Sequence, residues 1–194
     1  MTLIKGEIAE RVMAGRPLDH IPVIDMHGHL GTSGEYYYVP RNSEADVVAY
    51  LDRFGVDHMV AFAFTLSGDV RVGNDHVLSR AESRPDRFSA LVALHAGFPD
   101  DWLDLLEAGR ERGARGVKLI SAYQRVAEAT LDWSPVLDYA RDKGWMVLNH
   151  QWASAERLID YARRYPEIAF LIGHGFNALP AAVEACRNVY QCTC

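Results

Sequence analysis

Three polar side chains, Asp25, His27 and His29, occupy alternate positions early in the chain. Val23 and Ile24 before them predict a short buried strand, and side chains on a strand have a period of two. The three polar groups should therefore project from one face, where two imidazoles on a rigid strand can hold one metal ion. Hydrogen-bonded structural histidines are the alternative, because His-x-His alone is a weak metal motif. Further ligands at equivalent places in the chain would favour the metal.

Such residues recur at or just past the ends of later apolar segments. They are Lys118, His150 and His174, with His95 in an equivalent place. Each has a structural explanation by itself, as a surface lysine or a hydrogen-bonded core histidine. Imidazole nitrogen suits zinc, iron, nickel or copper, and together with a carboxylate it also tolerates manganese. A catalytic zinc ion keeps about three protein ligands and one open position for water or substrate.

A strand–helix unit that should position these residues repeats along the chain. Apolar segments predict strands at 57–64, 88–94, 116–120, 145–150, 168–174 and 188–192. Helical periodicity between them predicts helices at 74–83, 101–112, 134–143, 154–165 and 179–187. A helix over 4–14 precedes the first strand, and another follows Ser43, an N-cap with Asp46 three residues on, and ends near Gly55.

Strands that are apolar on both faces and alternate with amphipathic helices are typical of a parallel sheet covered by helices. A doubly wound sheet would need a glycine-rich phosphate turn after its first strand, and this sequence has none there. We therefore predict a single α/β domain over residues 1–194, of the (β/α)8 TIM-barrel type. The carboxyl ends of its strands would bring the polar residues together at one mouth of the barrel.

The chain is short for that fold. About seven strands fit into 194 residues, whereas a closed barrel usually takes ~250. We expect a barrel truncated before strand eight, either as a piece of a longer protein or as a natural truncation with an open edge. An open parallel edge invites pairing with another chain, which would make a homo-oligomer.

Composition excludes several partner classes. A net charge of −6 and a pI near 5.7 argue against nucleic acid or an anionic membrane as the main partner. No apolar run approaches the ~18 residues of a membrane span, and the N-terminus does not resemble a signal peptide. The three cysteines lie close to the C-terminus without a disulfide spacing, which favours reduced thiols and a cytoplasmic location.

The ordered polar motifs resemble a known family. They are Asp-x-His-x-His at 25–29, Gly-Val-Lys-Leu at 116–119, His150 and Gly-His-Gly at 173–175. This set is similar to the amidohydrolase superfamily, in particular its amidohydrolase-2 branch. The resemblance implies one divalent metal ion, zinc first and manganese as the alternative, bound by His27, His29 and His150. His174 would ligate the metal or exchange protons beside it. Lys118 would be carbamylated and bridge two metals, or stay an amine that contacts substrate.

One departure from the family concerns an acid from strand eight, which binds the metal or takes a proton from its water. That strand is not in this sequence.

We expect a hydrolase of a small-molecule amide, ester or lactone that uses metal-activated water. A metal-dependent, non-oxidative decarboxylase of an unsaturated or aromatic acid is the alternative. A catalytically impaired piece is the third reading.

Substrate contacts should come from loops at the same mouth. Tyr123 and Arg125 follow the fourth strand, and Arg125 could grip a substrate carboxylate or be a solvated loop residue. Trp152 follows His150 and could form a wall of the pocket or pack on the outer helices. His95 ends the third strand, and residues 36–38, three tyrosines, suit a pocket wall or lid.

Overall fold

The computed structural model describes residues 6–31, 40–63 and 69–192. The strands are β1 (Ile24–Leu30), β2 (His58–Ala63), β3 (Phe88–Ala93), β4 (Gly116–Leu119), β5 (Met146–Asn149), β6 (Phe170–Ile172) and β7 (Val189–Gln191). The α-helices are α1 (Glu7–Met13), α2 (Glu44–Phe54), α3 (Val70–Ser83), α4 (Trp102–Glu111), α5 (Ser134–Lys143), α6 (Ala155–Arg164) and α7 (Pro180–Ala185). Short 3-10 turns lie at Pro99–Asp101, Glu128–Thr130 and Gly175–Asn177.

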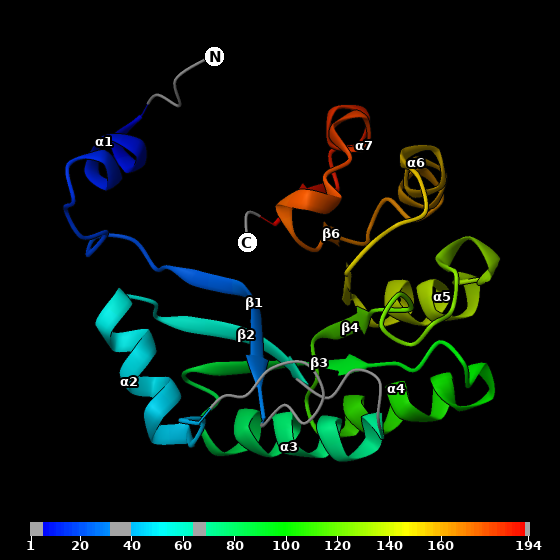
Figure 1. Cartoon of the computed structure of the whole chain (residues 1–194), viewed down its shortest axis with the longest axis horizontal. Helices are drawn as coiled ribbons and strands as arrows, with labels where there is room; N and C mark the ends of the chain where they lie inside the picture. The colour runs from blue at the N-terminus through cyan, green and yellow to red at the C-terminus, as the bar shows by residue number, and fades with distance from the viewer. Residues whose placement is uncertain (1–5, 32–39, 64–68, 193–194) are drawn as a thin grey trace.

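These strands form one sheet in the order β1 to β7, and every neighbouring pair is parallel. The sheet curls into a half-barrel with helices around its outside, and α1 lies apart from the rest (Figure 1). Within the described residues, β1 and β7 are the two edges of the sheet. The predicted α/β fold, an incomplete barrel with about seven strands, is confirmed. No helix in the described part of the chain is long and apolar enough to cross a membrane.

Strand alternation divides the apolar side chains into two cores. The larger core lies between the sheet and the helices and includes Val147 and Phe170. A smaller core fills the concave face and consists of Val60, Phe62, Leu91, Ile120, Leu148 and Leu171. This inner layer of bulky side chains forms the floor beneath the carboxyl ends of the strands.

The helix ends show how local sequence sets the elements. The predicted N-cap of α2 is confirmed, because Ser43 and Asp46 form a reciprocal capping box. Helix α3 starts at Val70, four residues before the predicted start at 74. The Asp69 side chain accepts a hydrogen bond from the Arg71 amide and so caps that extra turn.

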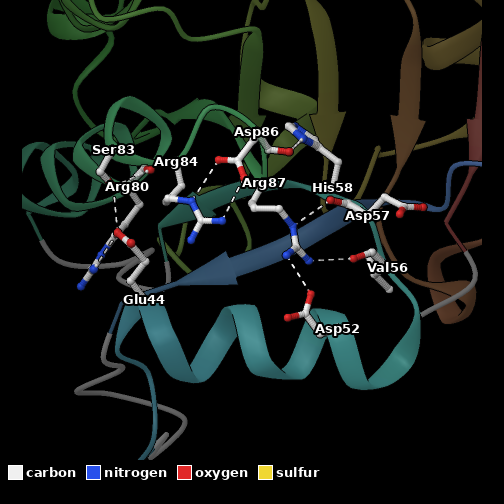
Figure 2. Close-up of polar contacts among 10 residues, drawn as sticks. All are labelled: Glu44, Asp52, Val56, Asp57, His58, Arg80, Ser83, Arg84, Asp86 and Arg87. Atoms are coloured by element: carbon white, nitrogen blue, oxygen red, sulfur yellow. Dashed lines mark hydrogen bonds and ion pairs between the residues drawn. The ribbon is translucent and has the colours of Figure 1, made fainter.

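Polar contacts fasten the opposite, amino-terminal end of the strands (Figure 2). The Arg87 guanidinium donates to the carbonyls of Val56 and Asp57 and to the Asp52 carboxylate, at 2.8–3.0 Å. His58 lies at the same end, where its Nδ1 is 3.2 Å from the Asp86 carbonyl. These contacts join α2 to the amino-terminal ends of β2 and β3. They therefore stabilise the fold and lie away from the carboxyl ends of the strands, where the polar site residues are expected.

Gly116 allows β4 and β5 to pair closely. A Cβ at this position would lie 2.5 Å from the Met146 carbonyl oxygen and 2.9 Å from Leu91 Cδ2. The first of these atoms is backbone of the paired strand, so it cannot rotate away. We expect Gly116→Ala to lower the free energy of unfolding by about 2–3 kcal/mol, measured by urea denaturation.

Gly175→Ala is the matched control for this substitution, because a Cβ there would meet open space at an ordinary φ. It should change stability by no more than ~0.5 kcal/mol. Equal effects of the two substitutions would show that the close approach at Gly116 does not limit stability.

Candidate active site

The carboxyl ends of four strands bring five polar side chains together on the concave face. They are His27 and His29 of β1, Lys118 of β4, His150 after β5 and His174 after β6. The His174 ring centroid lies 4.7 Å from that of His27 and 4.6 Å from that of His150. His174 therefore contacts two other imidazoles at once, and His29 lies beside His27 with a centroid distance of 5.6 Å.

Phe62 of β2 forms the apolar floor of this group. Its ring centroid is 4.2 Å from that of His29 and 5.2 Å from that of His27. Lys118 Nζ lies 4.3 Å from the same centroid, a cation–π contact. Phe62 was not among the predicted site residues, although its alternation with Val60 on the inner face of β2 is a signal in the sequence.

A change of register in β1 accompanies the histidines. Pairing with β2 shifts between Asp25 and Gly28, where β1 holds one residue more than its partner. The Asp25 carboxylate accepts a hydrogen bond of 2.9 Å from the His27 amide inside this bulge. Bulges often lie next to active sites, where they redirect a side chain.

Burial and neighbouring positive charge make these imidazoles weak bases. Desolvation, and then the Lys118 charge, lowers the pKa of His27 to about 2. The same two causes lower the pKa of His29 to about 3 and that of His150 to about 4. These rings are neutral at pH 7, which is the state that a metal ligand or a general base requires.

His174 has an unusual backbone. Its φ is 66° with ψ 139°, a conformation that residues with a Cβ rarely adopt. Its neighbour Gly173 allows β6 to approach closely, because a Cβ there would lie 3.1 Å from the Asn149 carbonyl and 3.2 Å from His27 Cε1. Strained backbone of this kind persists only where surrounding contacts hold it, and it clusters at functional sites.

The strain at His174 has a measurable consequence. We expect His174→Gly to be more stable than His174→Ala by about 1 kcal/mol, because glycine adopts a positive φ without the Cβ clash. Urea denaturation of the two variants in EDTA gives this difference. The reverse order, which is normal for a residue of ordinary φ, would contradict the backbone described here.

The structure brings one predicted substrate residue to the cluster. The Tyr123 ring centroid lies 4.8 Å from that of His150. Arg125, two residues further on, is exposed and has a φ of 57° in the loop after β4. Residues 36–38 lie outside the described residues.

Two other candidates point elsewhere. Trp152 is 2% exposed and packs against Tyr161 and Phe170 in the outer core. The His95 ring accepts a hydrogen bond from the Gly97 amide and contacts the Phe98 ring. His95 lines a separate cavity of about 400 Å³ that also includes Asp69, Val70, Arg71, Phe98, Asp101 and Leu105.

A buried carboxylate connects the two loops that flank His150. Glu128 follows β4 and accepts hydrogen bonds from the Trp133 indole (2.9 Å) and the Ala153 amide (2.8 Å). Arg157 of α6 donates to the same carboxylate at 3.2 Å. Glu128 therefore joins the loop after β4 to the loop after β5 without belonging to the imidazole cluster, and no motif in the sequence marks it.

A larger cavity of about 530 Å³ lies on the concave face and reaches the cluster at His27. It is lined by Ile24, Asp25, Met26, His27, Met146, Ala169, Leu171, Tyr190, Gln191 and Cys192. Most of these side chains are apolar. Ile24 and Met146 are the first residues of β1 and β5, His27 is in the middle of β1, and Gln191 is the last residue of β7. The cavity is of the size that small-molecule sites have.

The spacing of the histidine rings can be compared with the spacing of imidazole ligands around one zinc ion. Imidazoles that bind one zinc ion have ring centroids about 5 Å apart. The His27 and His29 centroids are 5.6 Å apart, and His174 lies 4.6–4.7 Å from His150 and His27. Within residues 6–31, 40–63 and 69–192, however, no three His, Cys, Asp or Glu side chains form a group that could hold a metal ion as they stand. The chemistry of the donors therefore fits a divalent metal, while a ready-made ligand set is not present in the described residues.

A parallel (β/α) half-barrel with polar groups at its carboxyl-terminal edge belongs to the TIM-barrel class of folds. Solved structures of that class are similar to it. A probable 2-pyrone-4,6-dicarboxylic acid hydrolase from Acinetobacter baumannii, with citric acid bound, has a TM-score of 0.59 and 18% identity. The match covers 88% of this chain and 69% of that one.

Two further solved structures are similar. An uncharacterised TIM-barrel protein from Bordetella bronchiseptica has a TM-score of 0.65 at 13% identity, over 88% of this chain and 74% of that one. A 5-carboxyvanillate decarboxylase from Sphingomonas paucimobilis has a TM-score of 0.55 at 12% identity, over 78% and 67%. This chain thus spans about two thirds to three quarters of the lengths of these neighbours.

The amidohydrolase family model matches residues 24–193, and the chain belongs to that family, amidohydrolase-2. The resemblance drawn from its polar motifs is confirmed. A comparison with curated proteins finds no match. The family and its structural neighbours are enzymes, which include a hydrolase, a hydratase and decarboxylases.

Proposed function

We propose that this chain carries the active site of a hydrolase that acts on a small-molecule amide, ester or lactone. The observation that supports this proposal is the position of His174. Its ring centroid lies 4.7 Å from that of His27 and 4.6 Å from that of His150, in a cluster that includes the buried Lys118. His27 and His150 have strongly lowered pKa values, so they are neutral at pH 7. His27 of this cluster also lines the cavity of about 530 Å³, and we propose that a small substrate lies there.

The residues would divide the work of hydrolysis. His174 accepts a proton from the attacking water and returns it to the leaving group, as a general base and then a general acid. Lys118 stabilises the negative charge that develops on the carbonyl oxygen. His27, His29 and His150 would hold a divalent metal, zinc or alternatively manganese, which when bound polarises a carbonyl and lowers the pKa of water.

Structural neighbours support the substrate class. The pyrone hydrolase is named for a cyclic ester with two carboxylates, and its structure contains citric acid. The cationic Lys118 within the cluster suits an acidic substrate of this kind. Decarboxylation is the second candidate, since decarboxylases of aromatic acids share the fold.

The test is a panel of lactones, esters and amides, each with and without a carboxylate, supplied to the purified chain with zinc or manganese. We expect acid release from an acidic lactone or ester, reduced at least 100-fold by His174→Ala. Glu184→Gln, an exposed change on α7, is the control that should keep full activity. Carbon dioxide release from an aromatic acid would favour the decarboxylase instead. No turnover with either metal would favour the alternative that the chain is a catalytically impaired piece.

The homo-oligomer and the cytoplasmic location stay predictions.

A further inference from the structure

The Gln191 side chain, at the end of β7, makes an uncommon set of contacts. Its Nε2 lies 2.9 Å from the His174 carbonyl oxygen and 3.3 Å from that of Ile172. It also lies 2.9 Å from the carbonyl oxygen of Cys192. One amide therefore joins the carboxyl ends of β6 and β7 at the residue whose backbone is strained.

Asn177 approaches the same peptide groups from the 3-10 turn after β6. Its backbone amide donates to the His174 carbonyl at 3.2 Å. Its side-chain Nδ2 donates to the His150 carbonyl at 2.6 Å and reaches that of Gly173 at 3.5 Å. The carbonyl of His174 thus accepts two hydrogen bonds, one from β7 and one from the turn.

These contacts fix the direction of the His174 carbonyl and so restrain a backbone with φ 66° and ψ 139°. A conformation that costs energy persists only if surrounding groups over-determine it. A change of the His174 backbone away from φ 66° and ψ 139° would turn its carbonyl away from both donors and would move its ring relative to His27 and His150. The hydrogen bonds therefore couple an amide on an edge strand to the placement of an imidazole in the site.

We propose that Gln191 is a positioning residue, whose amide N–H group holds the His174 carbonyl and thereby keeps the imidazole between His27 and His150. The consequence for catalysis rests on the proposed function of His174, whereas the placement of the ring does not. Glutamine is needed because the contact requires a donor at this distance from β7. Glutamate of the same shape would present oxygen to the carbonyl, and methionine would fill the space without a donor.

The first test is an NMR measurement on the whole chain, without substrate or metal. Histidine is labelled with ¹³C in the ring, and the His174 Cε1–Hε1 cross-peak is assigned by its loss in His174→Ala. We expect Gln191→Glu and Gln191→Met to shift or broaden this cross-peak. The cross-peak of His58, at the other end of the strands, should stay in place. Glu184→Gln should move neither cross-peak.

An unchanged His174 cross-peak in folded Gln191→Met would overturn the proposal, even if Gln191→Glu fails to fold. The second test uses any substrate found in the panel. We expect kcat of Gln191→Met to fall about 10- to 100-fold, because methionine has no donor to hold the His174 carbonyl. A moved cross-peak in a chain without activity would reject the proposed hydrolase and leave the positioning role intact.

Discussion

The free energy of unfolding is expected to fall by about 2–4 kcal/mol between pH 7 and pH 5 in the metal-free chain. Burial, and then the Lys118 charge, places the pKa values of His27, His29 and His150 at about 2, 3 and 4, against 6.5 for an ordinary histidine. As the pH falls below 6.5, the unfolded chain takes up protons at these residues and the folded chain does not. Their contribution to stability is therefore complete above pH 6.5 and is lost as the pH falls toward the folded values.

The size of this effect follows from linkage. Each histidine that is protonated only in the unfolded chain contributes about 1.4 kcal/mol per pH unit at most. Three such residues would together contribute about 6 kcal/mol by pH 5, and the partial exposure of His27 and His29 reduces this figure. Typical total stability is about 5–15 kcal/mol, so the loss is large.

Urea denaturation in EDTA at a series of pH values measures this slope. His27→Gln/His29→Gln should flatten it, because the unfolded variant has fewer protons to take up. His20→Gln, an exposed change near the first strand, should keep the steep dependence. A stability that is constant or rises from pH 7 to pH 5 would show that these imidazoles are not buried in a neutral state.

Replacing Lys118 by methionine should stabilise the chain at pH 7 by about 1–2 kcal/mol. Lys118 is fully buried, and at a buried charged position an apolar residue of similar volume is often neutral or stabilising, because taking an ammonium group out of water costs several kcal/mol. Methionine fills a similar volume, and its sulfur can contact the Phe62 ring that now lies 4.3 Å from Nζ. A gain in stability on removing a site residue is typical of function maintained at a cost in stability.

Thermal and urea denaturation at pH 7 test this second expectation. Lys143→Met is the matched control, because Lys143 Nζ also lies over an aromatic ring, Tyr139 at 5.5 Å, but on the exposed end of α5. We expect a change of ~0.5 kcal/mol or less for the control. A loss above ~1 kcal/mol in Lys118→Met would mean that the lysine is a net stabilising part of the core.

The polar positions could be predicted because the pattern is local and the topology is simple. His27 and His29 follow the period of a strand, and Lys118, His150 and His174 end strands that parallel topology brings to one edge. The side-chain direction of Trp152 could not be predicted from the sequence, because a residue in the loop after a strand can pack either in the outer core or on the concave face. The structure directs it outward against Phe170.

Other features arise from tertiary contacts that have no local signature. His174 has a positive φ, and its carbonyl accepts hydrogen bonds from Gln191 and Asn177, which lie on different elements. Phe62 gains its role only when β1 and β4 place His29 and Lys118 over its ring. Helix α3 starts four residues before the predicted start because Asp69 caps it, and aspartate is a residue type that marks helix starts in a sequence.

The central proposal is that His27, His29 and His150 bind a catalytic metal ion. Metal stoichiometry by elemental mass spectrometry, on the purified 194-residue chain and on His27→Ala/His29→Ala, tests it most directly. We predict about one equivalent of zinc or manganese in the chain and none in the folded double variant. Well-folded chain that binds no metal at saturating zinc and manganese, or equal binding by the double variant, would contradict it.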